Sequence, residues 1–158
     1  MKETPRIPLF FWQVMNRLNR GMISRYGSKS KVAGRVLVLT TMGRRSGQPR
    51  LTPLQYEEVD EVYYVASARG VRADWYCNLI ANPKVDVQVG DKHFSTAAKL
   101  MTDPGEIADF LEIRFKRHPH FMSAMLRLEG LPRKYTRADL EKFSNRLAIV
   151  ALHQENLY

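Results

Sequence analysis

The chain has 158 residues and 44% of them are hydrophobic, which is enough apolar material for one domain with its own core. No run of about 18 or more apolar residues is present, which excludes a membrane-spanning helix. The single cysteine excludes an internal disulfide and predicts a reducing, cytoplasmic location, and the net charge of +9 favours an anionic partner.

The first part of the chain predicts one helix followed by a group of strands. Apolar side chains recur at helical spacing over residues 8–24, which predicts an amphipathic helix. Strands are expected where apolar and β-branched side chains are concentrated, at residues 36–41, 50–59 and 62–68. The glycines and proline of residues 43–49 predict a turn, and Asp60-Glu61 joins the second and third strands as a hairpin.

The middle of the chain predicts a short helix and a second hairpin. Asp74 is placed to cap a helix over residues 75–82, which stops before a proline. Apolar and polar residues alternate over 85–89, which predicts a half-buried strand. Gly90-Asp91 should turn this strand into a tight hairpin with residues 92–101.

The last part of the chain predicts helices and a closing strand. Asp103-Pro104-Gly105-Glu106 resembles a capping box, from which a helix should run to about Arg117. The remaining elements are helices over 121–129 and 137–146 and a strand over 147–152.

Two tight hairpins favour an α+β fold in which an antiparallel sheet curls into a small barrel and the helices pack outside it. We expect residues 1–154 to form a single domain. Residues 155–158 match the start of a common protease-tag site, and we treat them as a tag remnant.

The run Gly43-Arg44-Arg45-Ser46-Gly47-Gln48-Pro49-Arg50 predicts a turn that binds an anion. Its glycines can adopt positive φ, so that backbone N–H groups converge, and its three guanidinium groups match phosphate oxygens. The turn lies in a stretch between Glu3 and Glu57 that has ten basic and no acidic residues, whereas the rest of the chain nets −1. The positive charge therefore concentrates around this turn, although an exposed polar loop would also fit the turn sequence alone.

Two further segments could contribute to a site. A proline inside the run Arg50-Leu51-Thr52-Pro53-Leu54 marks a sheet edge, a bulge or a backbone against which a ligand lies. Between Ser67 and Asn78 a strand ends, a basic loop follows, and a helix begins with Trp75. The Trp75 ring could pack on a flat ligand or in the core.

Motifs for several other chemistries are missing from the sequence. There is no dinucleotide fingerprint, phosphate loop, zinc-protease motif or nucleophile elbow. His118-Pro119-His120 has no companion ligands in the sequence, so we predict no metal site. No catalytic residue is selected, although Tyr26, Tyr76 and Tyr135 are available as proton donors.

Two blocks of the sequence resemble the deazaflavin-dependent nitroreductase family. The run from Thr40 to Leu54, TTMGRRSGQPRLTPL, is similar to the signature of that family. Val65-Ala66-Ser67 followed by Asp74 to Val85, DWYCNLIANPKV, resembles its second block. The order and spacing agree over roughly residues 33–100.

This resemblance implies a split β-barrel like that of proteins that bind flavin mononucleotide (FMN), and the cofactor coenzyme F420. The phosphate and oligoglutamate tail of this cofactor form a polyanionic end. By resemblance, the turn residues Arg44, Arg45, Ser46, Gly47 and Arg50 would hold that end. Thr52, Pro53 and Leu54 would lie along the deazaflavin ring, and Ser67, Arg69, Trp75 and Asn78 would complete the pocket.

The resemblance also implies a reaction, which is hydride transfer from the reduced deazaflavin to an electron-poor conjugated acceptor such as a quinone, an enone or a nitroaromatic compound. An FMN-dependent split-barrel oxidoreductase is the alternative within this class. A nucleic-acid-binding module and a cofactor carrier without turnover are alternatives from other classes. Few aromatic residues interleave with the basic ones, so we expect no nucleic-acid partner. The helix over 8–24 could also rest on the inner face of an anionic membrane, and we expect a monomer or homodimer.

Overall fold

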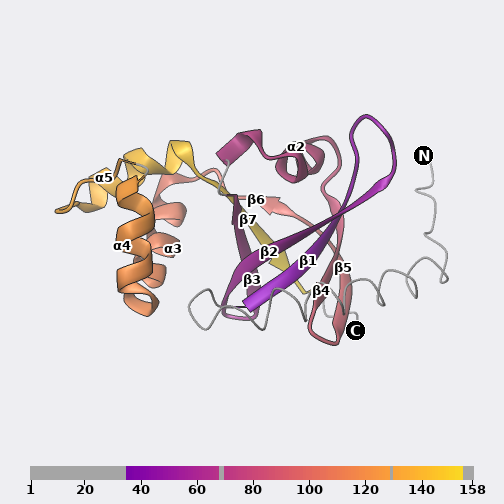
Figure 1. The fold of residues 1–158 in the computed structure, drawn as a ribbon, viewed down its shortest axis with the longest axis horizontal. Helices are drawn as coiled ribbons and strands as arrows, with labels where there is room; N and C mark the ends of the chain where they lie inside the picture. Colours follow the sequence, from indigo (N-terminus) through magenta and orange to yellow (C-terminus); the bar gives the residue numbers. More distant parts are fainter. Residues whose placement is uncertain (1–34, 68–69, 129, 155–158) are drawn as a thin grey trace.

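In a computed structural model the protein is described over residues 35–67, 70–128 and 130–154 (Figure 1). The expected helix over 8–24, Arg69 and residues 155–158, which we expect to be a tag remnant, lie outside these described residues. Among the described residues, no helix is long and apolar enough to span a membrane.

The described strands form one antiparallel sheet in the order β5-β4-β1-β2-β3-β7-β6. They are β1 (Arg35–Met42), β2 (Pro49–Val59), β3 (Val62–Ser67), β4 (Lys84–Val89), β5 (Lys92–Ala97), β6 (Lys99–Leu100) and β7 (Ala148–His153). Both predicted hairpins are present, and the residues at the tip of the first, Asp60 and Glu61, have the positive φ values that a tight turn needs.

The helices form two groups that lie apart (Figure 1). Helix α2 (Asp74–Ala81), preceded by the 3-10 turn η1 (Gly70–Arg72), packs near β1. The second group contains α3 (Pro104–Arg117), α4 (Pro119–Leu128), α5 (Arg137–Phe143) and the 3-10 turn η2 (Ser144–Arg146). The predicted α+β class with helices outside the sheet is therefore confirmed.

The sheet closes into a barrel at Ala98. Strands β5 and β6 stand at opposite ends of the strand order, yet only Ala98 separates them in the chain. The Ala98 N–H donates to the carbonyl of Pro83 at 2.7 Å, and the Met101 N–H, just after β6, donates to the carbonyl of Ile149 at 2.9 Å. The predicted single strand over 92–101 is wrong because the chain must bend here to pass from β4 to β7.

The barrel is split along the edge of β2 that faces away from β1. This strand pairs with β1 from Pro49 to Tyr56, but with β3 only from Tyr56 to Val59. Within the described residues, the stretch from Pro49 to Gln55 therefore has no strand on its other side. Pro53 lies in the middle of this stretch, opposite Val38, which agrees with the sheet edge among the three explanations that the sequence allowed.

Two apolar clusters hold the fold together, and β7 separates them. Val150 and Leu152 face the barrel interior, whereas Ile149 packs among the outer helices. This alternation follows from the period of two in a strand, and it buries both faces of β7. The barrel cluster also includes Leu37, Leu39, Val65, Trp75, Leu79 and Val87, and the helical cluster includes Ile107, Phe110, Leu111, Met122, Leu126, Leu140 and Phe143.

The helix starts agree with the sequence in one case and differ in another. The Asp103 carboxylate accepts the N–H of Glu106 at 2.9 Å, as predicted for the start of α3. The prediction that Asp74 caps α2 is wrong, because Ala73 occupies the N-cap without a side-chain hydrogen bond. Asp74 is the first helical residue, and its carboxylate contacts Arg44 instead.

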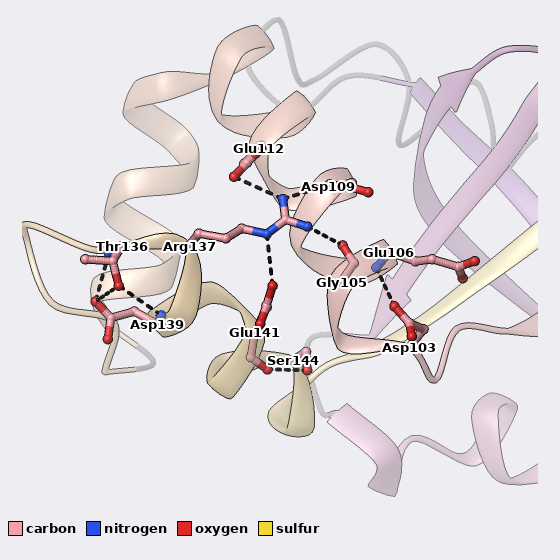
Figure 2. A network of polar contacts seen from close by, with 10 residues as sticks. All are labelled: Asp103, Gly105, Glu106, Asp109, Glu112, Thr136, Arg137, Asp139, Glu141 and Ser144. Carbon is pink, nitrogen blue, oxygen red and sulfur yellow. Dashed lines mark hydrogen bonds and ion pairs between the residues drawn. The ribbon is translucent and has the colours of Figure 1, made fainter.

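Arg137 ties α5 to α3, as Figure 2 shows. Its guanidinium contacts the carboxylates of Asp109 at 2.7 Å, Glu112 at 3.2 Å and Glu141 at 3.2 Å, and donates to the Gly105 carbonyl at 2.9 Å. The hydrogen bonds to these carboxylates raise the pKa of Arg137 above its ordinary value.

Replacing Arg137 with alanine should lower the melting temperature, because three carboxylates would lose their shared cation. The difference from the wild type should shrink as salt is added, since these groups are exposed. Thermal unfolding at low and high ionic strength would measure both effects. Arg133→Ala, which removes an exposed arginine from the α4–α5 connection, is the matched control and should change little. Equal melting temperatures for the two variants would contradict the prediction.

Candidate functional site

The turn between β1 and β2 is closed by its own backbone. The N–H of Gly43 donates to the carbonyl of Gln48 at 2.8 Å, and the N–H of Gly47 donates to that of Gly43 at 2.9 Å. Gly47 has φ +65°, as predicted, whereas Gly43, for which the same was expected, is not among the glycines with positive φ. Gly43 is required for a different reason, since a Cβ there would lie 2.5 Å from Ser46 Oγ and 3.2 Å from the Gln48 carbonyl oxygen.

The expected convergence of backbone N–H groups is largely absent. The N–H groups of Gly43 and Gly47 are used inside the turn, that of Gln48 donates to Ser46 Oγ at 3.2 Å, and that of Arg44 donates to Asn78 at 3.1 Å. Within the described residues, only Arg45 and Ser46 keep backbone N–H groups of the turn free. An anion at this turn would therefore be held mainly by side chains.

Helix α2 anchors the turn through Asn78, a residue that is only 4% exposed. Asn78 Oδ1 accepts both the Arg44 backbone N–H at 3.1 Å and an Arg44 guanidinium N–H at 3.0 Å. Asn78 Nδ2 donates to Thr41 Oγ1 at 3.2 Å, and the Arg44 guanidinium also pairs with Asp74 Oδ1 at 3.1 Å. One buried amide thus joins the end of β1, the turn and the helix.

Replacing Asn78 with alanine should destabilise the fold by about 2 kcal/mol, because the Thr41 hydroxyl and the Arg44 N–H would lose a buried partner. Urea unfolding would measure the change. Asn145→Ala removes an exposed amide from η2 and serves as the control. If both variants unfold at the same urea concentration, Asn78 does not anchor the turn.

Arg45 and Arg50 are the cations of the turn that remain available. Both are exposed, and neither side chain makes an ion pair or hydrogen bond within the described residues. Ser46 is also exposed, and its hydroxyl keeps its O–H to donate while Oγ accepts the Gln48 N–H. These three side chains form a positive rim on a rigid turn, which suits a phosphate or carboxylate group.

The rim continues into the split side of β2. Arg50, Thr52 and Leu54 are two residues apart, so they share one face of the strand, and Leu54 packs on the barrel cluster. Their partners on β1 are Thr41, Leu39 and Leu37, of which the two leucines are buried in the same cluster. Arg50 and Thr52 therefore lie at the mouth of the barrel, above its apolar interior, and Pro53 is half-buried on the opposite face.

The predicted site residues between Ser67 and Asn78 do not all lie beside the turn. Ser67 is buried at the end of β3, where it pairs with Ala148 of β7. Trp75 is only 7% exposed and belongs to the barrel cluster, with its ring edge-on to Tyr76 at 5.9 Å between centroids. The structure thus brings Asn78 to the turn and leaves Trp75 mainly in the core, while Arg69 lies outside the described residues.

Comparison with known proteins assigns this chain to a protein family. The model of the family described as F420H(2)-dependent quinone reductase matches residues 13–129, which is most of the chain. The chain belongs to the F420H(2)-dependent quinone reductase family. This match confirms the F420-dependent reductase family expected from the resemblance to the deazaflavin-dependent nitroreductases, with coenzyme F420 as the cofactor of that family.

Similar proteins occur in mycobacteria. An F420H(2)-dependent quinone reductase of Mycobacterium tuberculosis is 37% identical over 83 residues, which cover 51% of this chain and 56% of that protein. The chain therefore spans about half the length of the curated relatives it matches. A solved structure of a conserved hypothetical protein from Mycobacterium tuberculosis aligns with a TM-score of 0.53 at 18% identity, over 86% of this chain and 80% of that one. This likeness supports the fold.

Three tyrosines were candidate proton donors in this member of the quinone reductase family. The structure places two of them in different parts of the fold. Tyr76 is buried in the barrel cluster, and burial raises its pKa, so its hydroxyl stays protonated. Tyr135 stacks on Phe115 of α3, with ring centroids 4.7 Å apart, within the outer helical group. Tyr26 lies outside the described residues. Of the two candidate proton donors within the described residues, Tyr76 is on the helix that anchors the turn.

Sequence reasoning missed a second polar cluster, which surrounds Glu57 near the other end of β2. The Glu57 carboxylate contacts Arg117 at 2.6 Å, His118 at 3.1 Å and Arg114 at 3.8 Å. The sequence shows no companion ligand near His118, yet in the structure it faces this carboxylate. A cavity of about 320 Å³ also opens nearby, between α3 and the β2–β3 hairpin, lined by Val59, Asp60, Tyr64, Phe110 and other residues. Neither feature includes a residue of the Gly43–Arg50 turn.

Proposed function

We propose that this protein is an F420-dependent oxidoreductase that reduces a quinone. The observation that carries the proposal is the positive rim of Arg45, Ser46 and Arg50, held rigidly at the split side of β2. Two guanidinium groups without partners among the described residues fit the phosphate and oligoglutamate tail of this cofactor. The family match to residues 13–129 supports the same cofactor independently of the geometry.

Residues in different parts of the site would bind different parts of the cofactor. Arg45 and Arg50 would bind the polyanionic end, with Ser46 as a further hydrogen-bond donor. Thr52 and Leu54 lie on the barrel side of the unpaired stretch of β2 and would contact the flat ring, with Pro53 limiting how the strand can pair. Asn78 and Ser67, both buried, would shape the site from α2 and β3.

The cofactor, when bound, supplies the hydride, and the acceptor takes up that hydride and one proton to become a quinol. The protein's part is to orient the two flat molecules and to exclude water from between them. No protein nucleophile is needed for such a transfer. Quinones are the acceptor that the family description and the mycobacterial relatives name, and nitroaromatic compounds and enones are further acceptors of the same electronic character.

A fluorescence titration with coenzyme F420 beside FMN tests the cofactor. We expect saturable F420 binding at micromolar concentration and weaker FMN binding. The acceptor is then tested by mixing the protein with reduced F420 and a water-soluble naphthoquinone without oxygen, and following the return of deazaflavin fluorescence. No saturable F420 binding would overturn the proposal, and tight FMN binding in its place would favour the FMN-dependent alternative. F420 binding without quinone-dependent oxidation would indicate a carrier or a different acceptor.

Salt-dependent binding to DNA without deazaflavin binding would instead favour a nucleic-acid module. Contact with a membrane through residues 8–24 is a separate proposal, because that segment lies outside the described residues. Co-sedimentation with anionic phospholipid vesicles would test it, with neutral vesicles as the control.

A further inference from the structure

Arg44 differs from the other arginines of the turn because its guanidinium is already engaged. It donates to Asp74 Oδ1 at 3.1 Å, to the Asp74 carbonyl at 3.4 Å and to Asn78 Oδ1 at 3.0 Å. Its exposed neighbours Arg45 and Arg50 have no such partners within the described residues. The three arginines of one motif therefore have two different structural roles.

We propose that Asp74 is a positioning residue of the cofactor site, which acts by holding Arg44 so that the turn presents Arg45 and Arg50 to the anionic end of the cofactor. On this view Arg44 joins the turn to α2 and is not itself a phosphate ligand. The inference rests on the proposed function, since it assigns a role within the same site.

The geometry of α2 supports this role. Asp74 and Asn78 are four residues apart, so they lie on one face of the helix, and both contact the same guanidinium. Asn78 is in turn bound to Thr41, at the end of β1 just before the turn. The contacts thus form a closed loop from Thr41 through Asn78 to Arg44, and Asp74 fixes the outer end of the arginine.

The negative charge of Asp74 makes the inference testable, because a charge effect and a positioning effect would change the affinity for the cofactor in opposite directions. Its carboxylate is 82% exposed, and a carboxylate beside a polyanion site opposes binding if it acts only through its charge. Removing that charge should then tighten binding. If Asp74 acts by positioning the turn, its removal should weaken binding instead. An exposed ion pair contributes little to global stability, so the fold should survive the substitution.

The experiment is a fluorescence titration of wild type, Asp74→Ala, Asp74→Asn, Arg44→Ala and the double variant with Arg44→Ala and Asp74→Ala. Each is titrated with coenzyme F420 and with the deazaflavin fragment that lacks phosphate and tail. We expect Asp74→Ala to weaken F420 binding about threefold to tenfold, which corresponds to one lost local contact, and to leave binding of the fragment unchanged. Asp74→Asn, which keeps an acceptor oxygen, should restore part of the affinity.

The double variant decides whether Asp74 acts through Arg44. We expect it to bind F420 no more weakly than Arg44→Ala alone, because the carboxylate has nothing to position once the arginine is gone. Asp91→Ala removes an exposed acid from the β4–β5 hairpin and controls for net charge. Unchanged or tighter F420 binding by Asp74→Ala, or an additive loss in the double variant, would overturn the inference. A wild-type protein that does not bind F420 would instead refute the proposed function.

Discussion

Replacing Arg45 and Arg50 together with alanine should weaken the binding of coenzyme F420 by about 100-fold or more. Each substitution removes at least one charge-assisted hydrogen bond to the phosphate or tail, worth about 1.5 kcal/mol or more, and two of them give about 3 kcal/mol. The fold should remain intact, because neither side chain has a partner within the described residues. Fluorescence titration would measure the affinity and thermal unfolding the stability.

Ionic strength separates this effect from general electrostatics. The affinity of the wild type should fall as salt is added, and the double variant should show a shallower dependence because it has lost two cations of the site. Arg133→Ala removes an equally exposed arginine from the outer helical group and should leave the affinity unchanged. An F420 affinity that survives in the double variant would show that the polyanionic end binds elsewhere, for example on the basic residues before residue 35.

Local chemistry in the sequence was enough to predict most elements of this fold. Alternating apolar residues and the tight turns at Asp60-Glu61 and Gly90-Asp91 predicted both hairpins, because these features depend on neighbouring residues alone. The closure of the barrel at Ala98 could not be predicted in this way. It depends on where β7 lies, and β7 begins fifty residues later, at Ala148.

The site shows the same division between local and distant causes. The turn and its second glycine were predictable, because Gly47 needs a positive φ that few other residues adopt. The engagement of Arg44 was not, since its partners Asp74 and Asn78 are 30 and 34 residues away in the chain. No helix or strand periodicity links residues at such separations. The three arginines of the motif therefore look alike in the sequence and differ only in the structure.

The cluster around Glu57 is a further case of distant partners. Arg117 and His118 are 60 and 61 residues beyond the carboxylate that they contact. In the sequence, Glu57 is one acid beside another at the end of a strand, and nothing distinguishes it from Glu58. In the structure it fixes the end of α3 and the start of α4 to β2, which joins the outer helical group to the barrel.

Replacing Glu57 with glutamine should therefore destabilise the protein by about 2–3 kcal/mol, somewhat below the cost of breaking a fully buried ion pair. The Glu57 side chain is only 12% exposed and that of Arg114 16%. Burial lowers the pKa of Arg114, and its Nε is buried without a hydrogen-bond partner, so the charge of Glu57 is its main compensation. Glutamine keeps the shape but removes that charge, and urea unfolding would measure the loss.

The same variant should bind coenzyme F420 as the wild type does. Glu57 lies seven residues beyond Arg50 on β2, which corresponds to roughly 23 Å along an extended strand. Glu61→Gln, which changes an exposed carboxylate in the same hairpin, is the matched control and should alter neither property. The two variants would then affect different properties. Glu57→Gln would lower the stability and leave F420 affinity unchanged, whereas the Arg45 and Arg50 double variant would lower F420 affinity and leave the stability unchanged. A loss of F420 affinity in Glu57→Gln at temperatures where it is fully folded would show that the two ends of β2 are coupled.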